Sequence, residues 1–246
     1  MLQPERTKLL VEYLEKHRSA PVKQIARDLY MSETTVRRDL SVLEKQHIVR
    51  RSYGFAVLLK YGNNTLPLSM RMFDNRKEKA AIARKAAAAV REGSVLFIDE
   101  SSTSGLVAEY LDPTLDLTVV TSSLNTAGIL ADKRIKTYCT GGLVLPDTGS
   151  FAGGYAEPML ASVNADVCFF SASGVTETGC ICDKMEENAR IKRLMLARAA
   201  RKVFLCDHTK FGASFPFVAA DAADIDCLVT DADPPEPYRT LFKEIV

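Results

Sequence analysis

The sequence predicts an α/β protein with two parts, a small N-terminal winged helix-turn-helix domain and a larger α/β domain built on a parallel sheet. Residues 1–58 hold three short amphipathic helical patterns followed by a β-prone stretch around a glycine, whereas strand and helix patterns alternate after residue 77. Charge divides in the same way: residues 1–62 carry 12 Lys+Arg against 7 Asp+Glu, and the rest of the chain carries 20 against 24. A basic head on a mildly acidic body is typical of a nucleic-acid reader attached to another module.

The stretch that begins at Ser32 is typical of a DNA-recognition helix. The Ser32 hydroxyl can cap the helix, and Val36, Leu40 and Leu43 then form one apolar stripe. The other face carries hydroxyl and guanidinium groups, which can contact phosphates and base edges in a major groove. Helical patterns around residues 9–14 and 25–29 precede it, in the order of a helix-turn-helix.

Residues 48–57 are apolar and β-prone around Gly54, which predicts a hairpin wing next to the recognition helix. A solvated basic helix face, with no DNA contact, remains the alternative interpretation of the recognition stretch. The predicted DNA-contacting residues of the helix and wing are Ser32, Thr34, Thr35, Arg37, Arg38, Ser41, Arg50, Arg51 and Tyr53.

Cysteine and histidine usage argues against a metal site, and no cofactor is expected. The six cysteines form no C-x-x-C pair, and there are three histidines. The N-terminus has charges from Glu5 onward without an apolar leader region, and no apolar run approaches the ~20 residues that span a bilayer. These features predict a cytoplasmic protein with no membrane partner.

Three segments are expected: the winged helix-turn-helix domain at residues 1–58, a linker at 59–76, and a sensing and oligomerisation domain at 77–246. A long helix is predicted from Lys77 to about Arg91, and another from Glu186 to Arg201. The predicted strands cover residues 95–98, 117–120, 137–139, 166–170, 203–206 and 225–229. Alternation of this kind indicates parallel βαβ units with helices on both faces.

Polar or glycine turns follow five successive predicted strands. Because ligands of open α/β sheets bind at the carboxyl ends of strands, these turns predict one shared site for an anionic ligand. Helix capping by the same hydroxyls is the alternative for each turn taken singly. The candidate residues in these turns are Asp99, Ser101, Ser102, Thr103, Thr121, Ser122, Ser123, Asn125, Gly141, Gly142, Ser173, Gly174 and Lys210.

Motifs in both parts of the chain resemble those of the DeoR family of bacterial transcription regulators. Ser32–Leu40 is similar to the family's recognition-helix motif, and residues 51–57 resemble its R-x-H-G-G-A wing with two substitutions. Residues 71–79 fit R-x-x-x-N-x-x-E-K, and residues 207–212 fit D-x-S-K-F-G. Asp99–Thr103 lies where the family has D-S-G-T-T, with Glu100-Ser101 in place of Ser-Gly. Thr121–Ser123 lies where it has T-N-S, and residues 187–193 match an E-x-x-x-x-K-R helix.

The resemblance implies a winged helix-turn-helix joined to a sugar-phosphate-sensing domain similar in fold to ribose-5-phosphate isomerase. It implies a homo-oligomer, dimer or tetramer, that binds a double-stranded DNA operator and mostly represses sugar-catabolic genes until a phosphorylated sugar releases it. In this reading Lys210 pairs with phosphate, Asp99 and Glu187 bind sugar hydroxyls, and Lys192 belongs to the same site.

Two other functions stay open at the level of sequence. The body can be a sugar-phosphate isomerase or deaminase that carries a DNA-binding head, although Ser173 stands where the resembling isomerases place an aspartate. Alternatively, the body only dimerises the head and binds no ligand. The regulated genes, the operator sequence, the identity of the sugar and the choice between repression and activation do not follow from the sequence.

Overall fold

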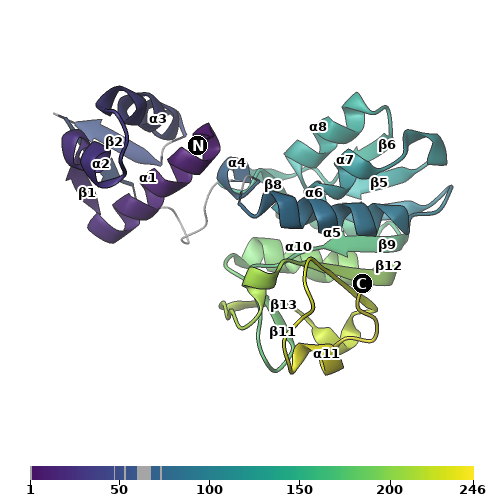
Figure 1. Cartoon of the computed structure of the whole chain (residues 1–246). Coiled ribbons are helices and arrows are strands. Elements are labelled where there is room, and N and C mark those ends of the chain that lie inside the picture. Colours follow the sequence, from purple (N-terminus) through teal and green to yellow (C-terminus); the bar gives the residue numbers. More distant parts are fainter. Residues whose placement is uncertain (1, 47, 53, 60–67, 73) are drawn as a thin grey trace. The chain divides into compact units, whose positions relative to one another are not determined.

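The computed structural model describes residues 2–46, 48–52, 54–59, 68–72 and 74–246. The chain divides into two compact units, Met1–Leu66 (the head) and Pro67–Val246 (the body), shown in Figure 1. The division falls inside residues 59–76, the predicted linker. Tyr53, a predicted DNA-contacting residue, lies outside the described residues. No helix in the described ranges is long and apolar enough to cross a membrane.

The head is a helix-turn-helix with a three-stranded antiparallel sheet of order β1-β3-β2. The predicted helix cap is confirmed, because Ser32 Oγ accepts a hydrogen bond from the Thr35 amide at 3.1 Å. The predicted wing is confirmed as the β2–β3 hairpin, which turns through Gly54 at a φ of +84°. The head elements are α1 (Gln3–His17), β1 (Ser19–Pro21), α2 (Val22–Asp28), α3 (Glu33–Lys45), β2 (Val49–Ser52) and β3 (Phe55–Leu58).

The apolar stripe of α3 is buried in the core of the head. Val36, Leu40 and Leu43 are fully buried. Beside them Asp39, also fully buried, is paired by Arg6 of α1, with Nε 2.6 Å from Oδ2 and Nη2 3.1 Å from Oδ1. This two-point pairing compensates a buried carboxylate that would otherwise be costly, and it joins α1 to α3.

The body is built on a six-stranded parallel sheet of order β14-β12-β9-β4-β5-β6, as the alternation of elements predicted. The helices and strands of the body are α4 (Leu68–Arg71), α5 (Arg76–Ala88), β4 (Val95–Ile98), α6 (Ser102–Gly105), α7 (Val107–Tyr110), β5 (Thr118–Thr121), α8 (Leu124–Asp132), β6 (Lys136–Cys139), β7 (Leu143–Leu145), β8 (Ser150–Ala152), α9 (Ala156–Ala161), β9 (Ala165–Phe170), β10 (Gly174–Val175), β11 (Cys180–Asp183), α10 (Glu186–Ala197), β12 (Ala199–Cys206), β13 (Phe217–Asp221), β14 (Cys227–Thr230) and α11 (Tyr238–Leu241).

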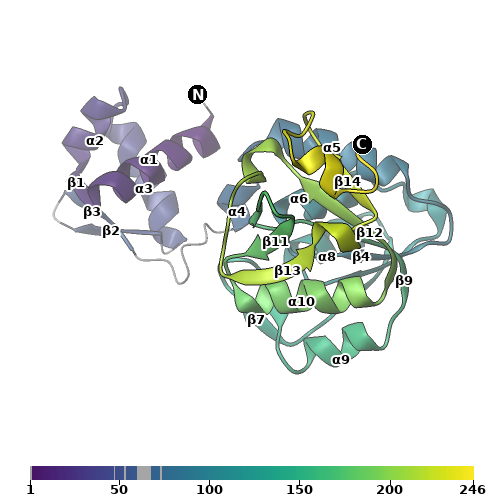
Figure 2. The same cartoon turned by 90° about the horizontal axis from the view of Figure 1, so that it is seen from below.

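Helices cover both faces of this sheet, with α5 on one side and α9 and α10 on the other (Figures 1 and 2). Alternation along β4 explains the two cores, because successive side chains of a strand point to opposite faces. Leu96 and Ile98 pack in a cluster with Ile82 of α5, whereas Phe97 packs in a second cluster with Ile191 of α10. The parallel sheet therefore brings the carboxyl ends of its six strands to one edge.

Some local structure differs from the sequence-based expectation. The helix predicted to reach Arg201 ends at Ala197, and β12 begins at Ala199, where the backbone pairs in parallel with Ala165 of β9. Strand pairing thus overrides the helix propensity of Ala199 and Ala200. The sequence analysis also missed the antiparallel sheet β10-β11-β13 and the β7–β8 hairpin.

Candidate DNA-binding face and effector site

The solvent-facing side of α3 presents most of the predicted DNA-contacting residues. Thr34, Arg37 and Arg38 are exposed, and Thr35 and Ser41 are half-buried. The Arg38 side chain is 69% exposed, and its Nε lies 3.9 Å from Oδ1 of the buried Asp39. Such an array suits phosphate and base contacts in a major groove.

The wing is tied to the recognition helix through Arg51. Its amide and Nε donate to the two carboxylate oxygens of Glu44 at 2.8 and 2.7 Å, and its Nη1 donates to Ser41 Oγ at 2.7 Å. Hydrogen bonds from Arg51 lower the pKa of Glu44, which keeps that carboxylate ionised. Arg51 and Ser41 therefore orient the wing on α3, while Arg50 is exposed beside them.

The turn of the helix-turn-helix exposes an aromatic residue that the sequence analysis did not single out. Tyr30 is 98% exposed and adopts a positive φ of 53°, which is uncommon for a residue other than glycine. The Tyr-Met pair before the Ser32 cap gave no signal in the sequence that the Tyr30 side chain would face solvent.

Five neighbouring strands of the body sheet each end at a buried side-chain oxygen that lacks a hydrogen-bond partner among the described residues. In sheet order from β12 to β6, these atoms are Asp207 Oδ2, Ser171 Oγ, Glu100 Oε2, Ser122 Oγ and Thr140 Oγ1. Buried polar atoms are normally hydrogen-bonded, so a row of unpartnered oxygens along one edge identifies a place where a polar ligand can bind.

Asp99, a predicted ligand contact, organises the loop after β4. Its carboxylate accepts hydrogen bonds from the Ser101 amide at 3.1 Å, Ser101 Oγ at 2.7 Å, Ser104 Oγ, and the Ser171 amide at 3.3 Å. Asp99 is fully buried. These bonds join the β4 loop to the β9 loop and leave Asp99 little capacity to accept from a ligand.

Lys192 of α10 lies at the centre of a buried charge cluster. Its Nζ lies 2.5 Å from Glu100 Oε1, 2.8 Å from Asp183 Oδ2 and 3.3 Å from Asp99 Oδ2. Burial disfavours the ammonium form, but the three carboxylates outweigh it and raise the pKa of Lys192. Burial raises the pKa of Glu100 to about 7 in spite of Lys192. Lys192 is 1% exposed and surrounded by carboxylates. Its role is therefore structural, because it joins Asp99, Glu100 and Asp183 beneath the site.

Two further cations lie at the site: Lys79 of α5 and Lys210 of η3 (His208–Lys210). Lys79 of α5 donates from Nζ to Ser102 Oγ at 3.1 Å and to the Arg71 carbonyl at 2.7 Å. Burial, reinforced by the positive charge of Lys210, lowers the pKa of Lys79 to about 8. Lys79 and Asn75 were not predicted as site residues from the sequence, although they lie in the R-x-x-x-N-x-x-E-K motif, the signal that could have indicated them.

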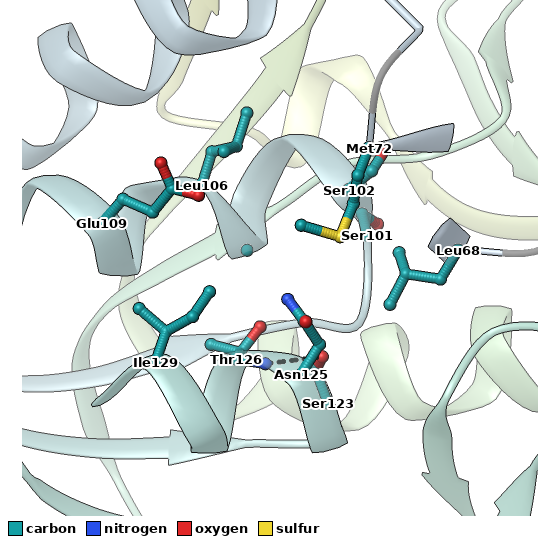
Figure 3. A pocket seen from close by; sticks show the side chains of 11 residues that line it. Leu68, Met72, Ser101, Ser102, Leu106, Glu109, Ser123, Asn125, Thr126 and Ile129 are labelled. Carbon is teal, nitrogen blue, oxygen red and sulfur yellow. Dashed lines mark hydrogen bonds between the residues drawn. The ribbon is translucent and has the colours of Figure 1, made fainter. Parts of the chain in front are cut away.

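A pocket of about 220 Å³, part of it open to solvent, lies between the start of α6 and the start of α8. Ser101, Ser102, Ser123 and Asn125, all predicted ligand contacts, line it, and the Asn125 side chain extends into it (Figure 3). Thr126 Oγ1, buried at the wall of this pocket, also has no hydrogen-bond partner in the described part of the chain. Leu68 and Met72, which were not predicted from the sequence, also line the pocket, and the rest of its lining is Gly105, Leu106, Glu109 and Ile129 (Figure 3).

Other predicted ligand residues have structural roles or lie apart from the pocket. Thr121 Oγ1 accepts from the Ser123 amide at 3.1 Å, and Thr103 is buried. Glu187 is exposed on the first turn of α10, where its neighbour Asn188 is the residue turned inward, toward Ser150 at 3.0 Å.

The predicted glycines are required mainly by the backbone. A Cβ on Gly142 would lie 2.6 Å from the Ala152 carbonyl oxygen, and one on Gly174 would lie 2.5 Å from that of Ala213. Gly141 has open space around it but a φ of +70°.

Ser173, another predicted ligand contact, is held by an internal partner. It donates from its amide and Oγ to Asp183 Oδ1 at 3.0 and 2.8 Å.

An exposed cationic recognition helix in one unit and a polar sheet edge in the other define a DNA-binding protein with an attached sensor module. A DeoR-like helix-turn-helix domain matches residues 6–61, and a DeoR C terminal sensor domain matches residues 74–232. The chain belongs to the DeoR family of transcriptional regulators, as its motifs predicted.

Curated relatives resemble the chain over nearly its whole length. It is 34% identical over 228 residues to the HTH-type transcriptional regulator GolR of Listeria innocua, which covers 92% of this chain and 90% of that protein. It is 28% identical over 236 residues to the glycerol-3-phosphate regulon repressor of Escherichia coli, with coverage of 96% and 93%. A ribose 5-phosphate isomerase A from Methanocaldococcus jannaschii aligns with a TM-score of 0.42 at 17% identity, over 56% of this chain and 55% of that one.

Proposed function

We propose that the chain represses sugar-catabolic genes by binding an operator through α3, and that a phosphorylated sugar bound at the carboxyl edge of the body sheet releases it. The row of unpartnered oxygens along five adjacent strand ends is the observation that carries the ligand site. Hydroxyls of a sugar can donate to the carboxylate oxygens of Glu100 and Asp207 and exchange bonds with the serine and threonine hydroxyls. A flat or apolar edge would offer none of these partners.

The cations of the site supply the phosphate position. Lys79 and Lys210 influence each other electrostatically, and Ser102 Oγ lies 3.1 Å from Lys79 Nζ. A phosphate here would relieve the repulsion between the two lysines and form charge-assisted hydrogen bonds. Lys192 is neutralised by three carboxylates, so its role in this proposal is to position Glu100 and Asp183.

We assign no catalytic step to the body. Glu100 nevertheless makes the alternative function, a sugar-phosphate isomerase, open to test. Glu100 combines a pKa of about 7 with an unpartnered Oε2, the properties of a general base at neutral pH. Isomerisation would exchange a carbon-bound hydrogen of the sugar with solvent. We therefore expect no deuterium incorporation from D₂O into a bound sugar phosphate, and incorporation above the protein-free rate would favour an isomerase.

Operator recognition in this proposal requires two copies of the chain. Helix-turn-helix proteins place recognition helices about 34 Å apart on operators with two-fold symmetry, one helix for each half-site. A homo-oligomer, dimer or tetramer, would supply them. Light scattering on the purified chain distinguishes these states from a monomer, which would require a different mode of operator binding.

A thermal-shift screen tests the proposed ligand class. The full chain is heated with a panel of pentose phosphates, hexose phosphates and glycerol 3-phosphate, each beside its unphosphorylated parent. A ligand of the native state raises the unfolding midpoint, so a shift for one phosphate and none for its parent is the expected result. The same compound should weaken binding to a duplex selected by the chain from a random library. If no compound of the panel shifts the unfolding midpoint, the body would act only as an oligomerisation module.

A further inference from the structure

Residues at the start of the body, from α4 to the first turns of α5, lie beside the ligand site. We call residues 68–79 the connector; all of them except residue 73 are described. The connector follows residue 67 in the chain and ends within α5.

The start of the connector forms one wall of the pocket. The Leu68 amide donates to the Asp147 carbonyl at 2.9 Å, which attaches α4 to the turn before β8. Leu68 and Met72 face the pocket opposite Asn125 (Figure 3). A ligand that fills this pocket must contact these two side chains or move them.

Polar contacts hold the rest of the connector to the same strand ends. Lys79 Nζ bridges the Arg71 carbonyl and Ser102 Oγ at 2.7 and 3.1 Å. Asn75, in the left-handed backbone conformation at a φ of 49°, donates from Nδ2 to Asp207 Oδ1 and Thr209 Oγ1, both at 3.4 Å. The groups that bind the connector are thus the groups that would bind a sugar phosphate.

Arg71 lies within electrostatic range of the buried acidic cluster. Its Nη2 is shielded from solvent. Burial lowers the pKa of Arg71, while the negative charges of Glu100, Asp183 and Asp99 oppose that effect. Lys192 and Arg71 together bring two positive charges to these three carboxylates, so Arg71 compensates charge that Lys192 alone leaves unbalanced.

We propose that the connector as far as Asn75 is a latch that closes the effector pocket in the ligand-free protein, and that an incoming sugar phosphate, held by Lys79, displaces it and so signals to the head. This inference rests on the proposed function. A phosphate is a stronger acceptor than the Arg71 carbonyl for the Lys79 ammonium, and sugar hydroxyls can donate to Glu100 Oε2. Since binding and release are thermodynamically linked, a protein with a weakened latch should bind effector more tightly and operator less tightly.

Hydrogen exchange on the full-length chain tests the latch without requiring a known effector. In Arg71→Gln we expect exchange of peptides covering residues 68–79 to rise at least fivefold, with unchanged protection in β9 and β12. Affinity for the library-selected duplex should fall at least fivefold. Arg201→Gln is the matched control, because it removes an arginine charge that pairs with Glu244 on the exposed surface of the body; it should change neither quantity.

A second variant guards against misfolding of Arg71→Gln. Asn75→Gly keeps the left-handed backbone and removes the bonds to Asp207 and Thr209, so it should loosen the same peptides and weaken the same duplex. Unchanged protection of residues 68–79 in both variants, or loosened peptides with wild-type operator affinity, would overturn the latch.

Failure of the latch and failure of the proposed function give different results. If a sugar phosphate shifts the unfolding midpoint and releases DNA while residues 68–79 stay protected, the ligand site stands and the latch is wrong. If no sugar phosphate binds, the proposed function fails, and the two variants still decide whether the connector controls operator affinity.

Discussion

Lys192 of α10 and Glu100 at the end of β4 form a buried ion pair, with Nζ and Oε1 2.5 Å apart and 92 residues between them in the sequence. Glu100 stands where the family motif has serine. Its carboxylate pairs with the ammonium of Lys192. The family motifs had indicated Lys192 as a ligand contact. The pair is joined by Asp99 and Asp183, so the floor of the site is an internally compensated charge cluster.

The stability of the body should respond to pH through Glu100. Burial raises the pKa of Glu100 from 4.5 to about 7, so the folded state binds this proton more tightly than the unfolded state. The associated stabilisation is complete below pH 4.5 and is lost as pH rises toward 7, a difference of up to about 3 kcal/mol. Glu100→Gln should remove this pH dependence in urea denaturation at pH 5 and pH 7.5. Glu157→Gln, at an exposed ion pair with Arg190, serves as the control and should keep it.

Effector affinity should fall in mildly alkaline solution because of Lys79. Burial and Lys210 lower the pKa of Lys79 to about 8, so most of its ammonium is lost at pH 9. We expect affinity for the phosphate found in the thermal screen to drop up to about tenfold between pH 7 and pH 9, measured by calorimetry. Lys79→Arg retains a charge at both pH values and should be insensitive. An equal drop in this variant would place the titrating group elsewhere.

Lys210→Ala should separate sensing from DNA binding. Lys210 acts on Lys79 and Asp207 at the ligand edge of the body, whereas the recognition helix belongs to the head. We expect wild-type operator affinity in fluorescence anisotropy but no release by the sugar phosphate. A variant that is released at the normal effector concentration would remove Lys210 from the site.

Arg38 and Arg50 should contribute differently to operator binding. Arg38→Ala should cost ~1–3 kcal/mol and relax sequence preference at one base pair if its exposed guanidinium contacts a base edge. Arg50→Ala, in the wing, should weaken all duplexes alike and lower the salt dependence by about one phosphate contact. Binding measured across single-base operator variants and salt concentrations distinguishes the two. Loss of affinity without any change in preference would make Arg38 a phosphate contact.

Asp39→Asn should destabilise the head. The substitution removes the charge that Arg6 pairs at two points in the core and leaves a buried amide against a guanidinium. We expect faster hydrogen exchange in α1 and α3 with unchanged exchange in the body. Asp28→Asn is the control, because Asp28 accepts from Tyr13 at the surface. Equal effects of both substitutions would show that the Arg6 pair contributes little.

The recognition helix could be predicted because its determinants are local. The Ser32 cap, the stripe formed by Val36, Leu40 and Leu43, and the Gly54 turn each depend on residues within one or two helical turns of the chain. The parallel sheet followed for a similar reason, since alternating apolar strands and helices restrict the chain to few topologies.

Roles within the ligand site could be predicted only in part. Polar turns after strands indicated where the site lies, but hydroxyls and carboxylates of the same type divide between ligand-facing and internal partners. Asp99 uses its oxygens on Ser101, Ser104 and Ser171, whereas Glu100 next to it keeps one oxygen unpartnered. That difference depends on side chains brought together from distant segments.

The sequence by itself therefore determined the two-domain architecture, the family and the edge of the sheet that carries the polar turns, because periodicity and capping act over a few residues. The tertiary structure alone decided that Lys192 is neutralised in the interior, that Glu187 faces solvent, and that Leu68 and Met72 line the pocket. Charge compensation and burial depend on neighbours that the chain supplies from positions far apart, and these become visible only when the strands are assembled.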